Sequence, residues 1–171
     1  MQDPHVPIHE ILHALGSHHE QSRADRDEYI TVNYGNIIPG DQSQFRKVDT
    51  KGLLDLNVPY DYRSVMHYGD NFFTRNGRRT IITKDPAFQN VIGRGRGMSY
   101  LDIKSVNLAY KCAPARCEEM ACADGGFVDK NCQCQCDGGR AGVIKACGEL
   151  WETFFMLMSE LLSSTNLAVV L

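Results

Sequence analysis

A cluster of histidines near the N-terminus constrains this chain more than any other feature. Four of its six histidines lie between His9 and His19, in the pattern H-E-x-x-H-x-x-G-x-x-H. On an α-helix, His9 and His13 are four residues apart and leave the same face, so both imidazoles can reach one point. His19 would lie ~15 Å from His9 along an unbroken helix. The spacing therefore predicts a helix that ends between His13 and His19.

Gly16 lets the chain turn between the second and third histidines of this pattern. Without a Cβ atom Gly16 adopts positive φ readily, so it can end the helix and return the chain toward His9 and His13. Three neutral imidazoles, His9, His13 and His19, can then hold one zinc ion per chain and leave a fourth position open for water, as in catalytic zinc sites. Glu10 can take a proton from that water as the general base. The alternative is that His9 and His13 are ordinary surface or core histidines of an amphipathic helix.

Length and charge exclude several other classes of protein. A chain of 171 residues has room for one domain and a small extra unit. Its formal net charge of −3 shows no excess of Lys or Arg, so we expect no nucleic-acid partner. No run of 18 or more uncharged apolar residues occurs, so the sequence predicts no membrane span.

The cysteines divide the chain into two unequal parts. Residues 1–111 contain none, whereas six of the seven lie between Cys117 and Cys147. This density is typical of a disulfide scaffold in an oxidising compartment, so we expect a secreted or extracellular protein with a boundary near Cys112–Cys117. The first residues lack the apolar core of a signal peptide, and we therefore expect the true N-terminus to be missing.

Longer stretches of sequence carry a family resemblance. The third histidine runs into Glu-Gln-Ser-Arg-Ala-Asp-Arg-Asp, residues 20–27, and Tyr60–Gly69 contains Ser-Val-Met-His-Tyr. Together with His9–His19, these stretches resemble the signature and the Met-turn of the astacin family of metzincin peptidases. The likeness extends through Ile92–Cys112 and covers residues 1–112. It implies an α+β fold for this part, namely the C-terminal part of an astacin-like catalytic domain.

The resemblance implies a role for each matching residue. The zinc ligands would be His9, His13 and His19, the general base Glu10, and the swinging additional ligand that helps hold the oxyanion Tyr68. Met66 would pack beneath the zinc site, and Glu20 would meet the N-terminus formed when a propeptide is cut away. Both Met66 and Tyr68 also have a plain structural interpretation, as a buried core methionine and a half-buried tyrosine.

The sequence departs from the family at its N-terminus. Only a few residues precede His9, so the half of the catalytic domain that would supply a twisted sheet and hold an extended substrate is absent. Cys112 resembles a cysteine whose partner lies in that half. We therefore expect this chain, taken literally, to be an inactive fragment.

The C-terminal third contains two further units. Residues 113–147 resemble an EGF-like module, a disulfide-rich unit that we expect to contact a protein partner. Its six cysteines allow 15 pairings, and a cysteine-rich metal cluster is the rival interpretation. Residues 148–171 form the pattern of an amphipathic helix with glutamates on one face, too short to span a bilayer. This tail either docks on another surface or is not used by the mature protein.

Two hypotheses remain for the function. The first is a secreted zinc metalloendopeptidase that acts on protein or peptide substrates through a zinc-activated water. The second is a truncated, non-catalytic extracellular interaction protein that retains a zinc site and an EGF-like binding module. Intact Glu10 and Tyr68 favour the enzyme, whereas the missing half favours the second hypothesis for the chain as it stands. The physiological substrate, disulfide pairing and oligomeric state do not follow from the sequence.

Overall fold

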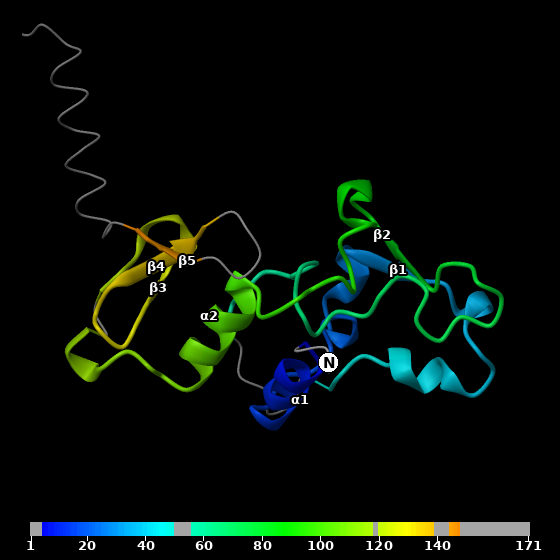
Figure 1. The fold of residues 1–171 in the computed structure, drawn as a ribbon, viewed down its shortest axis with the longest axis horizontal. Coiled ribbons are helices and arrows are strands. Elements are labelled where there is room, and N and C mark those ends of the chain that lie inside the picture. The colour runs from blue at the N-terminus through cyan, green and yellow to red at the C-terminus, as the bar shows by residue number, and fades with distance from the viewer. Residues whose placement is uncertain (1–4, 50–55, 118–119, 139–143, 148–171) are drawn as a thin grey trace, which may run out of the picture.

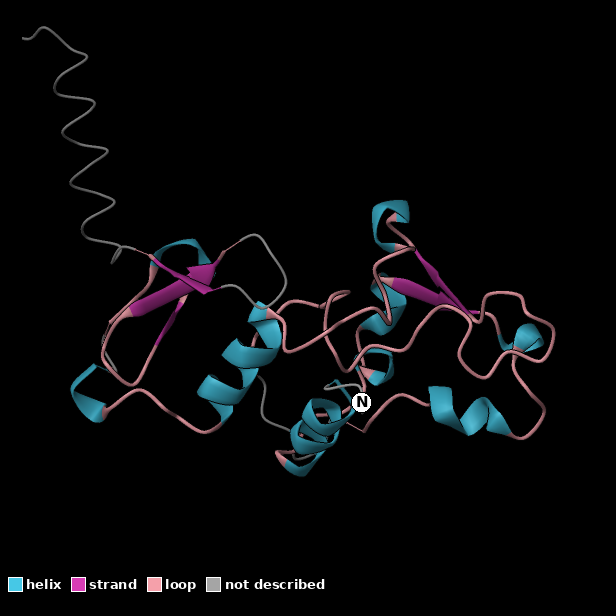
Figure 2. Ribbon diagram, viewed as in Figure 1, coloured by secondary structure: helices cyan, strands magenta, loops and turns pink. Residues whose placement is uncertain are grey.

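The computed structural model describes residues 5–49, 56–117, 120–138 and 144–147. Two α-helices are present in this part of the chain, α1 (His5–Ala14) and α2 (Tyr100–Ala109). The strands are β1 (Ile30–Val32), β2 (Ile81–Thr83), β3 (Phe127–Val128), β4 (Cys134–Asp137) and β5 (Ile144–Ala146) (Figure 2). Short 3₁₀ helices connect them, at Glu20–Ser22, Arg26–Glu28, Tyr34–Asn36, Asp41–Phe45, Pro86–Phe88, Ala115–Cys117 and Ala123–Gly125.

The larger part of the molecule is built around a two-stranded sheet. Strands β1 and β2 pair antiparallel, with Ile30 opposite Thr83 and Val32 opposite Ile81. β-Branched residues fill both strands, as expected for a half-buried pleated surface. A core of buried side chains packs beside the sheet: Ile30, Ile37, Phe45, Tyr60, Tyr68, Ile81 and Ile92. This core includes Tyr68, so the packing of the sheet directly positions one of the predicted site residues.

Disulfides hold the smaller, C-terminal part together. Strands β3, β4 and β5 form an antiparallel sheet in that order. The six cysteines pair as Cys117–Cys132, Cys122–Cys134 and Cys136–Cys147. The predicted disulfide framework is therefore present, with one of the 15 possible pairings. Cys112 is exposed and forms no disulfide with the described residues.

Helix α2 lies against the small sheet, and α1 lies between α2 and the β1–β2 part (Figure 1). The side chain of Ser99 accepts a hydrogen bond from the Asp102 N–H, and Asp102 accepts one from the Ser99 N–H. This capping box satisfies two backbone donors that a helix start otherwise leaves free. The capping box therefore fixes the backbone conformation of the first turn of α2.

Helix α1 begins at His5, four residues before His9, the first histidine of the pattern. Pro7 lies within its first turn, where a missing N–H costs no helical hydrogen bond. Leu12 is 2% exposed and anchors the helix, whereas Ile11 is 58% and Leu15 36% exposed. The apolar face of α1 is therefore only partly covered by the described residues.

None of the helices in the described ranges is long and apolar enough to cross a membrane. The amphipathic helix predicted for residues 148–171 lies outside the described residues.

Candidate metal centre

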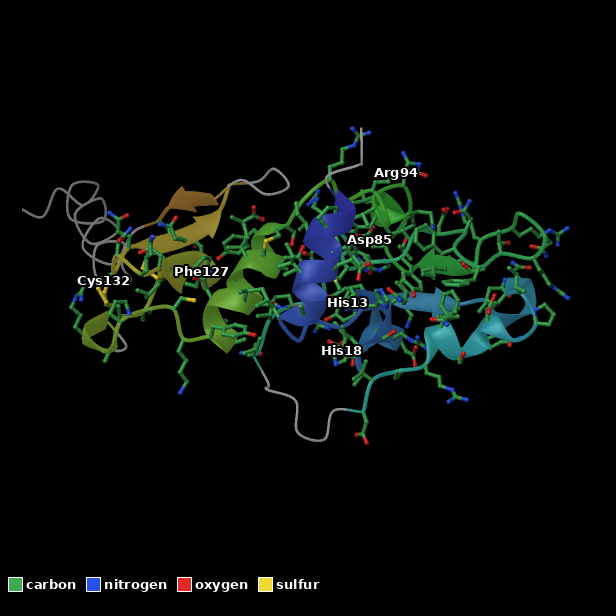
Figure 3. The ribbon with its side chains drawn as sticks, turned by 60° about the horizontal axis from the view of Figure 1, so that its bottom comes forward. His13, His18, Asp85, Arg94, Phe127 and Cys132 are labelled. Atoms are coloured by element: carbon green, nitrogen blue, oxygen red, sulfur yellow. A yellow bond between two sulfur atoms is a disulfide. The ribbon has the colours of Figure 1, made fainter. Side chains whose placement is uncertain are left out.

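The C-terminus of α1 returns the chain toward the two histidines that the helix carries. Gly16 adopts φ +88°. Its N–H donates to the His13 carbonyl at 2.9 Å, and the Ser17 N–H donates to the Leu12 carbonyl at 2.9 Å. These two bonds form a Schellman motif, which satisfies the last carbonyls of the helix and reverses the chain. His19 consequently lies beside the helix face of His9 and His13. Figure 3 shows His13 on this helix.

Three imidazole nitrogens converge on one point. The Nε2 atom of His19 lies 3.2 Å from the Nε2 atoms of both His9 and His13. Among the described residues, these three side chains form the one group of His, Cys, Asp or Glu with the spacing of a metal site. The structure thus brings together the three residues that the sequence pattern selected.

Hydrogen bonds on the far side of two rings decide which nitrogens face this point. The Nδ1–H of His9 donates to the Val65 carbonyl at 2.9 Å, and that of His13 donates to the Ser17 carbonyl at 2.8 Å. Carbonyls only accept, so each Nδ1 carries the proton and each Nε2 presents a lone pair. Burial, with smaller contributions from the neighbouring imidazoles, lowers the pKa of His19 to about 4, so this ring is neutral at pH 7.

This arrangement of donor atoms fits zinc. Two nitrogens each 2.0–2.1 Å from a tetrahedral ion lie about 3.3–3.4 Å apart, close to the 3.2 Å separations in the structure. Lone pairs that face one another at this distance repel unless a cation or a proton lies between them. The carbonyl partners of His9 and His13 are the outer hydrogen bonds that metal-bound histidines commonly make.

Tyr68 lies at the side of this cluster. Its ring centroid is 4.5 Å from that of His19. The same ring also packs against the rings of Phe45, Phe72 and Phe73. Its N–H donates to Gln21 Oε1 at 3.1 Å. Its carbonyl accepts from His67 Nδ1 at 2.7 Å. Both peptide groups of Tyr68 are therefore held by side chains that sequence reasoning did not select.

The two acidic residues have different environments. Glu10 is exposed on α1, next to His9. Glu20 is mostly buried, and one oxygen accepts from the Asp61 N–H at 2.7 Å and from Arg23 Nη1 at 3.2 Å. Burial raises the pKa of Glu20 to about 7, although Arg23 and the Asp61 N–H act in the opposite direction. Glu20 also lines a cavity of about 1180 Å³.

The turn before Tyr68 links the histidines to α2. Met66 is 2% exposed, and its carbonyl accepts from the Glu20 N–H at 3.1 Å. Asp102, on α2, accepts hydrogen bonds from Ser64 and Val65. Sequence reasoning missed Asp102, although the pattern Ser-x-x-Asp at residues 99–102 is a readable capping signal.

Comparison with known proteins identifies the family. The family model described as astacin, a peptidase family, matches residues 3–111. This chain belongs to the astacin family. The resemblance drawn from the histidine pattern and the Met-turn is thus confirmed at the level of the family. The comparisons do not identify the EGF-like module.

Named relatives and a solved structure agree with this membership. Blastula protease 10 of Paracentrotus lividus is 45% identical over 79% of this chain, and zinc metalloproteinase nas-6 of Caenorhabditis elegans is 44% identical over 74%. The structure of high choriolytic enzyme 1, a hatching enzyme zinc-protease of medaka, superposes with a TM-score of 0.56 at 46% identity and covers 61% of this chain. The chain has an astacin-like fold of helices and sheets.

The match covers only part of each relative. This chain spans 23% of blastula protease 10, 39% of nas-6 and 51% of the medaka enzyme.

Proposed function

We propose that this chain carries the catalytic centre of a secreted zinc metalloendopeptidase that hydrolyses peptide bonds in proteins or peptides. One observation carries the proposal: the Nε2 atoms of His9 and His13, on a helix that also carries Glu10, each lie 3.2 Å from the Nε2 atom of His19. Astacin-family membership and relatives named as zinc metalloproteinases support the same reaction class.

Each site residue has one role in this proposal. His9, His13 and His19 hold one zinc ion, which when bound supplies a Lewis acid and lowers the pKa of water. Glu10 accepts the proton of the attacking water as the general base. Tyr68 is the swinging additional ligand, and its hydroxyl stabilises the negative charge that develops on the peptide carbonyl oxygen. Met66 packs beneath the site.

We extend the proposal to the remaining chain. Residues 1–112 belong to the peptidase domain, 113–147 form an EGF-like module that contacts a protein partner, and 148–171 form a tail. Three disulfides within 113–147 support an oxidising, extracellular location. Glu20, buried beside a cavity, is suited to receive a positively charged group such as a chain N-terminus.

We expect the 171-residue chain to lack peptidase activity by itself. Ile11, on α1, and Leu15, just after it, stay partly exposed and so forgo part of the about 1.5–3 kcal/mol that full burial of such a side chain contributes. Catalysis needs the site held to within roughly 0.5 Å of its productive geometry, a stricter demand than zinc binding alone, and a partly packed helix does not ensure it. Catalysis is therefore best tested in a chimera. It joins the part of the medaka enzyme that this chain does not match to residues 5–171.

The test replaces the proposed base in this chimera. Glu10→Gln should keep one bound zinc and reduce kcat/KM for a peptide substrate by at least ~100-fold, the lower end of general-base contributions. Glu28→Gln, which changes an exposed glutamate elsewhere, should leave hydrolysis unchanged. A Glu10→Gln chimera with normal activity would overturn the role of Glu10, and a zinc-loaded chimera without activity would favour the non-catalytic alternative.

Tyr68→Phe in the same chimera should lower kcat and leave KM nearly unchanged, because the proposed hydrogen bond forms as the oxyanion develops. A normal kcat with a raised KM would instead place Tyr68 in ground-state substrate binding.

A further inference from the structure

A chain of hydrogen bonds leads from one proposed zinc ligand to helix α2. His9 Nδ1–H donates to the Val65 carbonyl at 2.9 Å. The Val65 N–H in turn donates to Asp102 Oδ2 at 3.1 Å. One residue of the turn therefore separates the imidazole from the carboxylate, although His9 and Asp102 are far apart in the sequence.

Asp102 holds more of this turn than the single Val65 N–H. Its other carboxylate oxygen accepts from Ser64 Oγ at 2.6 Å, and Ser64 Oγ accepts from the Met66 N–H at 3.0 Å. Ser64 is 2% exposed, so these bonds are shielded from competing water. The carboxylate thus fixes three consecutive residues of the turn that carries the acceptor for His9.

The same carboxylate is fixed by its own helix. Asp102 Oδ2 also accepts from the Ser99 N–H at 2.9 Å, and the Asp102 N–H donates to Ser99 Oγ at 2.9 Å. The position of Asp102 therefore follows the position of the first turn of α2, which is a rigid element rather than a loop.

The cysteine-rich part holds that first turn from the other side. The Tyr100 hydroxyl lies 3.3 Å from the Gly125 carbonyl and 3.2 Å from the Gln135 carbonyl, so its single proton is shared between these two acceptors. Lys104 Nζ donates to the same Gly125 carbonyl at 2.7 Å. The Tyr100 ring packs against Phe127, which is 4% exposed. Because Tyr100 and Asp102 share one helical turn, a shift of the small sheet would move the carboxylate.

We propose that Asp102 is a positioning residue for the zinc ligand His9, and that the cysteine-rich part strengthens zinc binding by holding α2 in place. The inference rests on the proposed zinc site. Residues that orient a metal ligand from outside typically change metal affinity 10–100-fold when they are lost. Asp102 acts on the ligand through the backbone of Val65, which sets the direction of the His9 ring and the proton on its Nδ1.

The experiment measures the zinc dissociation constant of the 171-residue chain by competition with a chromophoric chelator. Asp102→Ala should raise this constant at least tenfold. Asp85→Ala is the matched control, because it makes the same substitution at an exposed aspartate whose side chain only caps the short helix Pro86–Phe88, by accepting from the Ala87 N–H. Its zinc dissociation constant should stay within about threefold of the wild-type value. Melting temperatures of the zinc-free proteins separate this effect from general destabilisation.

A second arm tests the contribution of the cysteine-rich part. Tyr100→Phe removes the hydroxyl that donates to the Gly125 and Gln135 carbonyls of this part but keeps the aromatic ring. It should weaken zinc binding in the wild-type background and have no further effect in the Asp102→Ala background, as expected for two residues that act through one path. Equal effects in both backgrounds would overturn the role of the cysteine-rich part.

The remaining outcomes are distinguishable. An Asp102→Ala chain that binds zinc within threefold of wild type would overturn the inference and leave the proposed function intact. If Asp102→Ala does not fold, Asp102→Asn decides by the same criterion, since one amide oxygen cannot serve both Ser64 and the two N–H donors. A folded wild-type chain that binds no zinc would instead overturn the proposed function.

Discussion

His67 is a buried histidine whose protonation state is determined by its two neighbours. The Tyr60 hydroxyl donates to its Nε2 at 2.8 Å, and its Nδ1–H donates to the Tyr68 carbonyl at 2.7 Å. The side chain is only 4% exposed. Burial lowers the pKa of His67 to about 4, so the ring is neutral across the physiological range.

This depressed pKa makes stability depend on pH. In the unfolded chain His67 titrates near 6.5, so between pH 6.5 and 4 the unfolded state binds more protons than the folded state. The contribution of His67 to stability is therefore complete above pH 6.5 and is lost as pH falls toward 4, by about 3 kcal/mol. Urea unfolding of the zinc-free chain should show this loss in wild type and a weaker pH dependence in His67→Gln.

The matched control for this measurement is His18→Gln, which replaces an exposed histidine and should keep the wild-type pH dependence. Identical slopes of unfolding free energy against pH in wild type and His67→Gln would contradict the assignment of a neutral, buried His67.

Single residues also show which parts of the site are readable from sequence. His9, His13, Gly16 and His19 lie within eleven positions, so helix periodicity and one glycine turn were enough to predict that they meet. The residues that hold them in place were not predicted. Asp102 reaches Val65 across 37 positions, and no local pattern encodes such a contact.

At the scale of elements, the end of α1 depends on one backbone conformation. Gly16 has φ +88°, and a Cβ atom there would meet nothing within 4 Å. A substitution at this position is therefore limited by backbone strain and not by space. Gly16→Ala should lower the unfolding free energy by about 1–2 kcal/mol, the cost of a left-handed conformation for a residue with a Cβ atom.

Gly97→Ala provides the comparison, since Gly97 also has open space around it but no positive φ. It should change the unfolding free energy by less than about 0.5 kcal/mol. Gly16→Asn should fall between the two, because asparagine tolerates the left-handed region better than alanine. Equal unfolding free energies for Gly16→Ala and Gly97→Ala in chemical denaturation would show that the turn does not need glycine.

Short elements were the hardest to predict. The helix predicted to carry His9 and His13 and to end before His19 is present as His5–Ala14, because helix periodicity extends over enough residues to be recognised. The strands contain two to four residues each, too few for an alternating pattern to stand out. The pairing of β1 with β2, such as Ile30 with Thr83, joins residues that are distant in the sequence and depends on the assembled core.

At the scale of the whole molecule, α2 connects two parts with different sources of stability. The part around β1 and β2 relies on an apolar core, whereas the cysteine-rich part is cross-linked by three disulfides. Small units gain most from such cross-links because their cores are limited. Cysteine density predicted a boundary near Cys112–Cys117, and the family resemblance placed it after residue 112. This division stays a prediction, as does the EGF-like character of 113–147.

The central claim is that three histidines hold one zinc ion, and metal analysis of the folded 171-residue chain tests it most directly. After equilibration with zinc and removal of the unbound metal, wild type and His18→Ala should each retain one zinc per chain. His13→Ala should retain none, because two imidazoles without the third do not form the site. A folded wild-type chain without zinc, or a His13→Ala chain that still holds one zinc, would contradict the account.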